Sequence, residues 1–453
     1  MRETLQRETI GRTDGDRLSL RSEPKTGDGL GRRYLLYSHD GVGLGHTCRN
    51  VAIARAITSE DESATVLLAT GSDDAVRLGI PDRVEVLKLP SLRKVANETY
   101  ASRRLLVSPD DIHRIRARLL AGVVGAFRPD VVLVDKHPLG AGGELREALS
   151  LNRELGGSAV LGLRDILDEP ETVRAEWERH DLGSRIASIY DRVLIYGQRG
   201  VFDPVTAYGL TGEVVLRSVF CGYVARGARE AREVGGMRLE SGSGESGGLV
   251  GGSLPVVMAT VGGGEDGATL VSVFLEASCG APWRAIAVSG PLAAEGTHER
   301  LEGLSRRAGA VLHRFLPDMC RRMEGVDALV CMGGYNTLAE AVGLGLPVVC
   351  VPRVHPRREQ LMRAKAFERL GLLECLPPSA LTVASLRESI LRALGRKRAD
   401  VARRCAMEIR LDGASRAAAV LRSVTPGREE RRGVGAEASR RGVGIERRAK
   451  RAA

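Results

Sequence analysis

The feature that most constrains this chain is a strand-then-helix alternation that occurs twice and is interrupted once by a segment rich in glycine and serine. In both series, short apolar runs of strand length alternate with longer segments of helical pattern. Strands that alternate with helices predict parallel sheets covered by helices on both faces. We therefore expect an α/β protein of two Rossmann-like, doubly wound domains. A length of 453 residues and a hydrophobic content of 43% suit two cores rather than one.

The composition divides the chain into five segments. Residues 1–31 alternate in charge and lack an apolar stretch, which predicts a disordered arm. An N-terminal Rossmann-like domain is expected over 32–230 and a C-terminal one over 255–424. Residues 231–254 are rich in Gly, Ser and Glu and form the predicted linker. A basic, disordered tail is expected over 425–453.

The apolar runs place the expected strands and helices. Strands are expected at 34–38, 65–69, 84–87, 131–134, 159–163 and 192–196, then at 255–261, 285–289, 311–313, 328–331 and 347–351. Ser108, Pro109 and two acids predict a helix start, and that helix runs to Phe127. Two further helices are expected to close the second domain, over about 383–394 and 400–423.

Charge and cysteine usage exclude several classes of function. The formal net charge is +10, but residues 427–453 hold nine Arg or Lys against four Glu, so much of the excess lies in the tail. With only 4% aromatic residues, a nucleic-acid groove is disfavoured. Eight scattered cysteines without a C-x-x-C pair support neither a zinc site nor a disulfide framework. Without a secretory signal or spanning segment, a cytoplasmic protein is expected, with at most peripheral contact of its tail with anionic lipid.

The first glycine-rich loop follows the first strand and opens a helix. It reads Asp-Gly-Val-Gly-Leu-Gly-His from residue 40, and Arg49 lies one turn further. It matches neither a nucleotide P-loop nor G-x-G-x-x-G. Gly43 and Gly45 let the backbone approach a ligand, and His46 is expected in the first helical turn. We favour a functional His46 over a packed or capping one.

The second glycine-rich loop contains Gly262, Gly263 and Gly264. It satisfies G-x-G-x-x-G after a strand, which is typical of a dinucleotide site. The next strand, however, ends Ala-Val-Ser-Gly, without the acid that would bind a ribose hydroxyl. NAD is therefore disfavoured, and a phosphate-binding or interdomain loop is preferred.

The third loop carries the most specific pattern. Residues 331–340 read Cys-Met-Gly-Gly-Tyr-Asn-Thr-Leu-Ala-Glu, and a second polar segment runs from Val351 to Gln360. Glu340 lies about one helical turn past Asn336, on the same face, where a carboxylate can accept two ribose hydroxyls. Glu359 and Gln360 can contact sugar hydroxyls.

This third segment resembles the C-terminal domain of glycosyltransferase family 28, the MurG-like GT-B enzymes, and in particular a predicted bacterial branch with Met-Gly-Gly-Tyr-Asn-Thr, Val-Pro-Arg and Glu-Gln. The likeness spans residues 33–421 and includes the Gly-x-Gly-His loop. It implies two domains facing a cleft, with the acceptor on the N-terminal and the nucleotide sugar on the C-terminal side. The donor residues it implies are Gly262, Gly263, Gly264, Arg314, Phe315, Gly333, Gly334, Asn336, Thr337, Glu340, Arg357, Glu359 and Gln360.

The acceptor side of the resemblance consists of Gly43, Gly45, His46 and Arg49. His46 is the expected general base. Asp135 and the Arg164–Asp165 pair end other strands, and either aspartate is an alternative base, an acceptor contact or a helix cap. Three more histidines at 39, 137 and 355 are unranked candidates for the same cleft.

The leaving diphosphate is expected to be stabilised without a metal. The Asp-x-Asp of metal-dependent transferases occurs only at Asp14–Asp16, in the expected arm. Helix N-termini and arginines would then carry this role, with Arg353 and Arg357 as candidates or as ordinary surface charges. No cofactor is expected beyond the nucleotide-sugar co-substrate.

These observations favour a metal-independent, inverting glycosyltransferase that moves a hexosyl group, an N-acetylhexosaminyl group included, from a UDP- or TDP-sugar to a hydroxyl of a small or lipid-linked acceptor. A nucleotide-sugar 2-epimerase of the same fold, which needs no acceptor, is one alternative. A non-catalytic GT-B subunit that activates a partner is the other.

Overall fold

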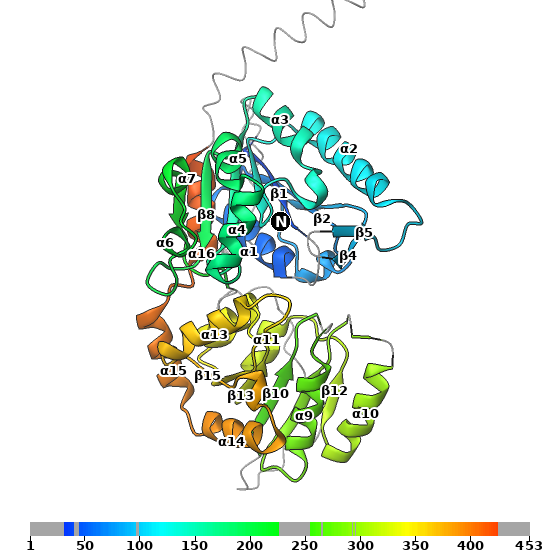
Figure 1. Cartoon of the computed structure of the whole chain (residues 1–453), viewed down its shortest axis with the longest axis vertical. Coiled ribbons are helices and arrows are strands. Elements are labelled where there is room, and N and C mark those ends of the chain that lie inside the picture. Colours follow the sequence, from blue (N-terminus) through cyan, green and yellow to red (C-terminus); the bar gives the residue numbers. More distant parts are fainter. Residues whose placement is uncertain are drawn as a thin grey trace, which may run out of the picture.

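The computed structural model describes residues 31–39, 45–96, 99–225, 254–263, 266–291, 293–294 and 296–424. The predicted arm, linker and tail therefore lie outside the described residues, except for Gly31 and Leu254 at their ends. Gly43 and Gly264 lie outside them too. The rest of the chain forms two α/β halves, the first coloured blue to green and the second green to orange in Figure 1.

The first half is built on a seven-stranded parallel sheet in the order β3-β2-β1-β6-β7-β8-β9. Its strands are β1 (Arg33–Tyr37), β2 (Thr65–Thr70), β3 (Val84–Lys88), β6 (Val131–Asp135), β7 (Ser158–Arg164), β8 (Arg192–Tyr196) and β9 (Ser218–Phe220). Its helices are α1 (Gly45–Glu60), α2 (Pro109–Phe127), α3 (Arg146–Glu154), α4 (Pro170–Arg179), α5 (Leu182–Ile189), α6 (Pro204–Ala207) and α7 (Gly212–Arg217). The strand order reverses between β1 and β6, and ligands of such sheets bind at the carboxyl ends of the strands at this point.

The second half repeats the plan with a six-stranded parallel sheet in the order β12-β11-β10-β13-β14-β15. Its strands are β10 (Val256–Thr260), β11 (Arg284–Val288), β12 (Val311–His313), β13 (Ala328–Cys331), β14 (Val348–Cys350) and β15 (Glu374–Cys375). Its helices are α9 (Ala268–Ser278), α10 (Thr297–Ala308), α11 (Met319–Glu324), α12 (Tyr335–Gly343), α13 (Glu359–Arg369), α14 (Val383–Leu394) and α15 (Arg398–Glu408). The switch point of this sheet lies between β10 and β13.

The central strands are buried on both faces, which explains their continuous apolar sequences. In β1, Leu35 and Tyr37 pack into one core cluster, and Tyr34 and Leu36 pack into another on the opposite face. The cluster that holds Tyr34 continues into the second half, where it includes Tyr335 and Phe367. The two sheets are therefore joined by a continuous apolar core, and the predicted fold class is confirmed.

The start of α2 agrees with its sequence pattern. The Ser108 hydroxyl accepts a hydrogen bond from the Asp111 N–H at 3.1 Å, and Pro109 is the first helical residue. A hydroxyl cap satisfies one of the N–H groups that a helix start leaves unpaired.

The predicted helix over 400–423 is wrong as a single element. It is broken into α15 and α16 (Gly413–Ser423), and Ile409 between them is extended. At the break, the Tyr223 N–H donates to the Arg410 carbonyl at 2.8 Å and the Gly413 N–H donates to the Tyr223 carbonyl at 3.1 Å, so the backbone there pairs with another segment instead of continuing the helix. Beyond the break, α16 returns to the first half and packs against α1, away from the domain to which the sequence assigned it (Figure 1).

One hairpin was not predicted. The strands β4 (Leu92–Ala96) and β5 (Thr99–Ser102) pair antiparallel outside both main sheets. Both strands are short, β4 contains Arg93 and Lys94, and neither has the apolar run of a central strand. Among the described helices, none is both long and apolar enough to cross a bilayer.

Candidate active site

His46 and Asp135, which the sequence nominated separately, contact each other. His46 lies in the first turn of α1, and Asp135 is the last residue of β6. The Nδ1 atom of His46 lies 2.7 Å from Oδ2 of Asp135. The carboxylate is buried, whereas 13% of the His46 side chain is exposed. The pair thus presents an oriented imidazole at the switch point of the first sheet.

Arg49 holds the carboxylate from the other side. One turn after His46 on α1, its NH2 group donates to both oxygens of Asp135, at 3.0 and 2.8 Å. Its guanidinium also lies over the rings of Tyr196 and Tyr335, 5.0 and 5.3 Å from their centroids. Arg49 is buried, so it orients the Asp135 carboxylate and stabilises its ionised form rather than binding an acceptor directly.

This environment sets the protonation states. Burial lowers the pKa of His46 to about 4, against the opposing effect of Asp135. Burial opposes the charge of Asp135, but Arg49 and His46 outweigh it and lower the pKa of that carboxyl to about 2. At neutral pH the imidazole is neutral beside an ionised carboxylate.

The tautomer of His46 follows from its neighbours. An ionised carboxylate only accepts hydrogen bonds, so Nδ1 must carry the proton. The NH2 group of Arg49 also lies 3.0 Å from Nδ1, but two donors cannot bond each other, so that approach is not a hydrogen bond. The lone pair is then on Nε2, on the side of the ring away from Asp135. That is the arrangement a general base requires.

His39 and His137 lie beside this pair. The His39 ring stacks on His137 and meets His46 edge-on, with centroid distances of 6.0 and 6.1 Å. His39 is buried, and its Nε2 bonds the hydroxyl of Tyr100 on β5 at 2.8 Å. Burial lowers the pKa of His39 well below its usual range, with Lys136 adding to the effect. His39 therefore forms part of the wall of the site. The β4–β5 hairpin, which brings Tyr100 to His39, could not be predicted because its sequence has no clear strand pattern.

Asp165 does not join the His46 pair. It is buried, and it accepts hydrogen bonds from the Ile166 N–H at 2.8 Å and the Tyr223 hydroxyl at 2.7 Å. Burial raises its pKa. Tyr223 in turn contacts Tyr335 and Phe367 of the second half. The structure thus gives Asp165 a place in the packing between the halves, which the sequence could not show.

On the donor side, α12 begins where the sequence placed its glycine turn. Gly333 has a φ of 84°, and a Cβ there would lie 3.0 Å from the Cys350 sulfur, so this position requires glycine. Gly334 caps α12. The side-chain amide of Asn336 donates to the Gly45 carbonyl at 3.0 Å, which joins the starts of α12 and α1. Thr337 and Glu340 follow on α12, and both are partly exposed.

The second donor segment forms a paired network. The Gln360 Oε1 atom accepts from the Arg353 N–H at 3.2 Å, and the Arg353 guanidinium contacts Glu359 at 3.1 Å and Asp266 at 3.2 Å. Glu359 is buried, so Gln360 is the better placed of the two to meet a sugar.

Arg357 and its neighbour make contacts across the domains. Arg357 pairs with Glu176 of α4 at 3.2 Å, and Arg358 pairs with Glu169 at 2.6 Å. Arg353 and Arg357, the two expected phosphate cations, are therefore both engaged by carboxylates.

The remaining donor candidates lie at the ends of β10 and β12. Gly262 is exposed with a φ of 65°, and Gly263 is partly exposed beside it. Arg314 is exposed, and Phe315 is partly buried. Their roles stay predictions.

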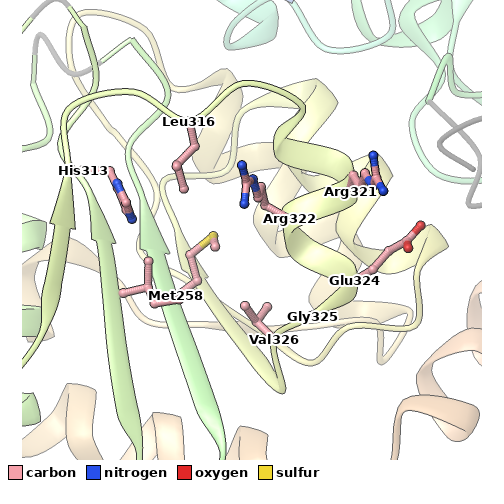
Figure 2. Close-up of a pocket in the computed structure, with 9 residues that line it drawn as sticks. Met258, His313, Leu316, Arg321, Arg322, Glu324, Gly325 and Val326 are labelled. Carbon is pink, nitrogen blue, oxygen red and sulfur yellow. The ribbon is translucent and has the colours of Figure 1, made fainter. Parts of the chain in front are cut away.

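Figure 2 shows a cavity of about 530 Å³ between α11 and the sheet of the second half. Its lining includes the apolar residues Met258, Ile286 and Val326, together with His313 and Leu316, which flank Arg314 and Phe315 in the sequence. Its lining residues all belong to the second half, so this cavity is separate from the His46–Asp135 pair.

Comparison with known proteins agrees with this geometry. Residues 271–416 match the glycosyltransferase family 28 C-terminal domain. The second half of the chain is therefore similar to the C-terminal domain of this glycosyltransferase family. The match covers α12, α13 and most of the donor candidates, so these residues lie in the part of the chain that is similar to the family 28 domain.

Solved GT-B structures show the same fold over most of the chain. UGT71G1 of Medicago truncatula, complexed with UDP-glucose, is 10% identical, with a TM-score of 0.57 over 88% of this chain and 99% of that one. The glycotransferase of kitacinnamycin is 16% identical, with a TM-score of 0.55 over 87% and 99%. MurG of Acinetobacter baumannii is 12% identical, with a TM-score of 0.51 over 86% and 99%. At these identities the likeness establishes the fold.

Proposed function

We propose that the transferase moves a hexosyl group, an N-acetylhexosaminyl group included, from a UDP- or TDP-sugar to an acceptor hydroxyl, with inversion at the anomeric carbon and without a metal ion. The observation that carries this proposal is the 2.7 Å contact between His46 and Asp135. A neutral imidazole with its lone pair on Nε2 can take the proton of an acceptor hydroxyl as that oxygen attacks. Direct attack by an activated hydroxyl inverts the anomeric centre.

Three further points support the donor class. The Gly333–Gly334 turn opens α12, and the N-terminus of a helix favours phosphate. Glu340 lies on that helix two turns after the glycine pair, where its carboxylate can accept ribose hydroxyls. One structural neighbour, UGT71G1, is a complex with UDP-glucose.

The decisive test is incubation with a panel of UDP- and TDP-sugars, with and without cell extract as a source of acceptor. A transferase releases nucleoside diphosphate in an acceptor-dependent manner and gives a product of inverted anomeric configuration. A 2-epimerase would isomerise the donor without extract, and a non-catalytic subunit would do neither. A retained anomeric configuration would contradict the base role of His46.

Metal independence is tested separately. Activity should survive EDTA, because the proposed stabilisation of the leaving group comes from helix N-termini and arginines. Loss of turnover that magnesium or manganese restores would refute this part of the proposal.

A further inference from the structure

Arg164 stands out among the arginines between the two halves. It is the last residue of β7, two positions beyond Gly162, which pairs with the catalytic Asp135 in the sheet. Its side chain is partly buried, and its Nε atom is buried without a hydrogen-bond partner. Within the described part of the chain, the guanidinium makes no hydrogen bond or ion pair with any other group.

The Arg164 guanidinium lies among charged groups of both signs. Burial lowers its pKa to about 10, and Arg363 adds to this effect, so the group remains charged at neutral pH. Glu359, Arg49 and Asp135 also act on it electrostatically. A partly buried charge without a partner is costly unless a ligand pairs with it.

The carboxylates near Arg164 are engaged elsewhere. Asp135 accepts hydrogen bonds from Arg49 and from His46. Glu359 directs Oε1 to Arg353. Because neither comes within ion-pair distance of Arg164, no protein anion described here neutralises it.

The side chain of Arg363 connects the segment next to Arg164 with the glycine turn of the donor side. The guanidinium of Arg363 donates to the Gly333 carbonyl and to the Ile166 carbonyl, each at 3.3 Å. One side chain thus ties the glycine turn before α12 to the segment directly after Arg164. A phosphate bound at the start of α12 would therefore lie close to the end of β7.

We propose that Arg164 binds the diphosphate of the nucleotide-sugar donor and stabilises it as the leaving group. This inference rests on the proposed function. It replaces Arg353 and Arg357 in that role, because both of those side chains are paired with carboxylates.

The charge balance of the reaction explains why such a cation helps. The bond between the anomeric carbon and the β-phosphate oxygen breaks, and its electron pair goes to that oxygen. The acceptor oxygen forms the new bond to carbon and loses its proton to His46. The diphosphate thereby gains one negative charge, so a fixed arginine binds it more strongly at the transition state than in the donor.

The test is calorimetric titration of the wild type, Arg164→Gln and Arg164→Lys with three probes: UDP, UMP and uridine, run in parallel with TDP, TMP and thymidine. We expect Arg164→Gln to weaken nucleoside diphosphate binding about 10- to 100-fold, the size of one or two charge-assisted hydrogen bonds. The loss should be smaller for the monophosphate and within about twofold for the nucleoside. Arg164→Lys keeps the positive charge but loses the bidentate geometry of the guanidinium, so its loss of diphosphate affinity should be intermediate.

Arg77→Gln is the matched control, because its side chain is 66% exposed and lies on the surface beside Asp74. It should leave the binding of all three probes unchanged. Thermal unfolding of each variant separates a binding defect from a folding defect, and Arg164→Lys serves if the glutamine variant does not fold.

Three results would overturn the inference. An equal loss for uridine and UDP would mean that Arg164 supports the site generally. Unchanged UDP and TDP affinity together with unchanged turnover would remove it from the site. A rise confined to the acceptor KM would assign its charge to the acceptor. If the wild type itself bound neither diphosphate, the donor class of the proposed function would fail as well, whereas the first three results leave it standing.

Discussion

The two sides of the candidate active site are organised differently. On the N-terminal side, His46, Asp135 and Arg49 form a closed set in which the carboxylate oxygens are occupied and the protonation states are fixed. On the C-terminal side, the Asn336 Oδ1 and Glu359 Oε2 atoms are buried without a hydrogen-bond partner among the described residues. The His46–Asp135–Arg49 set is thus arranged before substrate binds, whereas Asn336 and Glu359, like Arg164 at the end of β7, have hydrogen-bonding capacity that a ligand can use.

The largest expected effect tests the catalytic side. His46→Ala should lower kcat by about 10²–10⁴, the contribution typical of a positioned general base. The Kd for UDP, measured by calorimetry, should change little. His180→Ala, at the exposed end of α4, is the control. Near wild-type turnover would remove His46 from the mechanism and direct attention to His39 or His137.

The next largest effect is expected on stability, when the buried ion pair between Arg49 and Asp135 is removed. Arg49→Met removes the buried partner of Asp135 and should destabilise the protein by about 3–5 kcal/mol, as expected when one member of a buried pair is lost. The exposed pair of Arg77 and Asp74 gives the control, since Arg77→Met should cost at most about 1 kcal/mol. Chemical denaturation measures both. Equal losses would mean that the Arg49 pair is no more than a surface contact.

The donor side should respond in binding rather than in chemistry. Glu340→Gln should raise the Kd for UDP about tenfold, and Glu340→Ala should raise it further, because a charged acceptor contributes about 1.5–3 kcal/mol per hydrogen bond. Glu388→Gln, on the exposed face of α14, is the control. Gln360→Ala should weaken the intact sugar donor and spare UDP. An equal loss for both ligands on the Gln360 change would contradict these assignments.

The smallest expected effect is that of pH. Because burial lowers the pKa of His46 to about 4, its neutral form predominates down to about pH 5. A rate profile of kcat should therefore change less than about twofold between pH 5.5 and 7.5 on account of this group. An ordinary histidine of pKa about 6.5 would lose about tenfold over the same range. A midpoint near 6.5 that belongs to His46 would show that the site is wetter than the structure indicates.

Much of this fold could be predicted because its strands are buried on both faces. Runs such as Leu35–Tyr37 and Val131–Val134 have no other stable place than the centre of a parallel sheet. The rule that ligands bind at strand ends then nominated both His46 and Asp135. Their contact could not be predicted, since 89 residues separate them and only the β1–β6 pairing brings them together.

Where sequence reasoning failed, the cause lies in contacts between distant segments. Asp165 directly follows a strand, much as Asp135 ends one, but the hydroxyl of Tyr223, 58 residues later, donates a hydrogen bond to it. Arg353 and Arg357 looked like free cations, and only the approach of Asp266 and Glu176 shows that they are paired. The helix break before Gly413 likewise coincides with backbone hydrogen bonds to the distant Tyr223.

Because α16 returns to the first half, the chain crosses between the two halves twice, and the two crossings lie side by side. Where the chain leaves the first half and where it comes back, the two passing segments bond each other: Tyr223 N–H donates to the Arg410 carbonyl at 2.8 Å, and Gly413 N–H donates to the Tyr223 carbonyl at 3.1 Å. Two domains that are joined along one edge can open by a hinge rotation about that edge, and the joint resists sliding of one domain past the other. A cut between residues 225 and 254 should therefore leave both pieces attached through α16, so the two could be produced as separate polypeptides that reassemble into one enzyme.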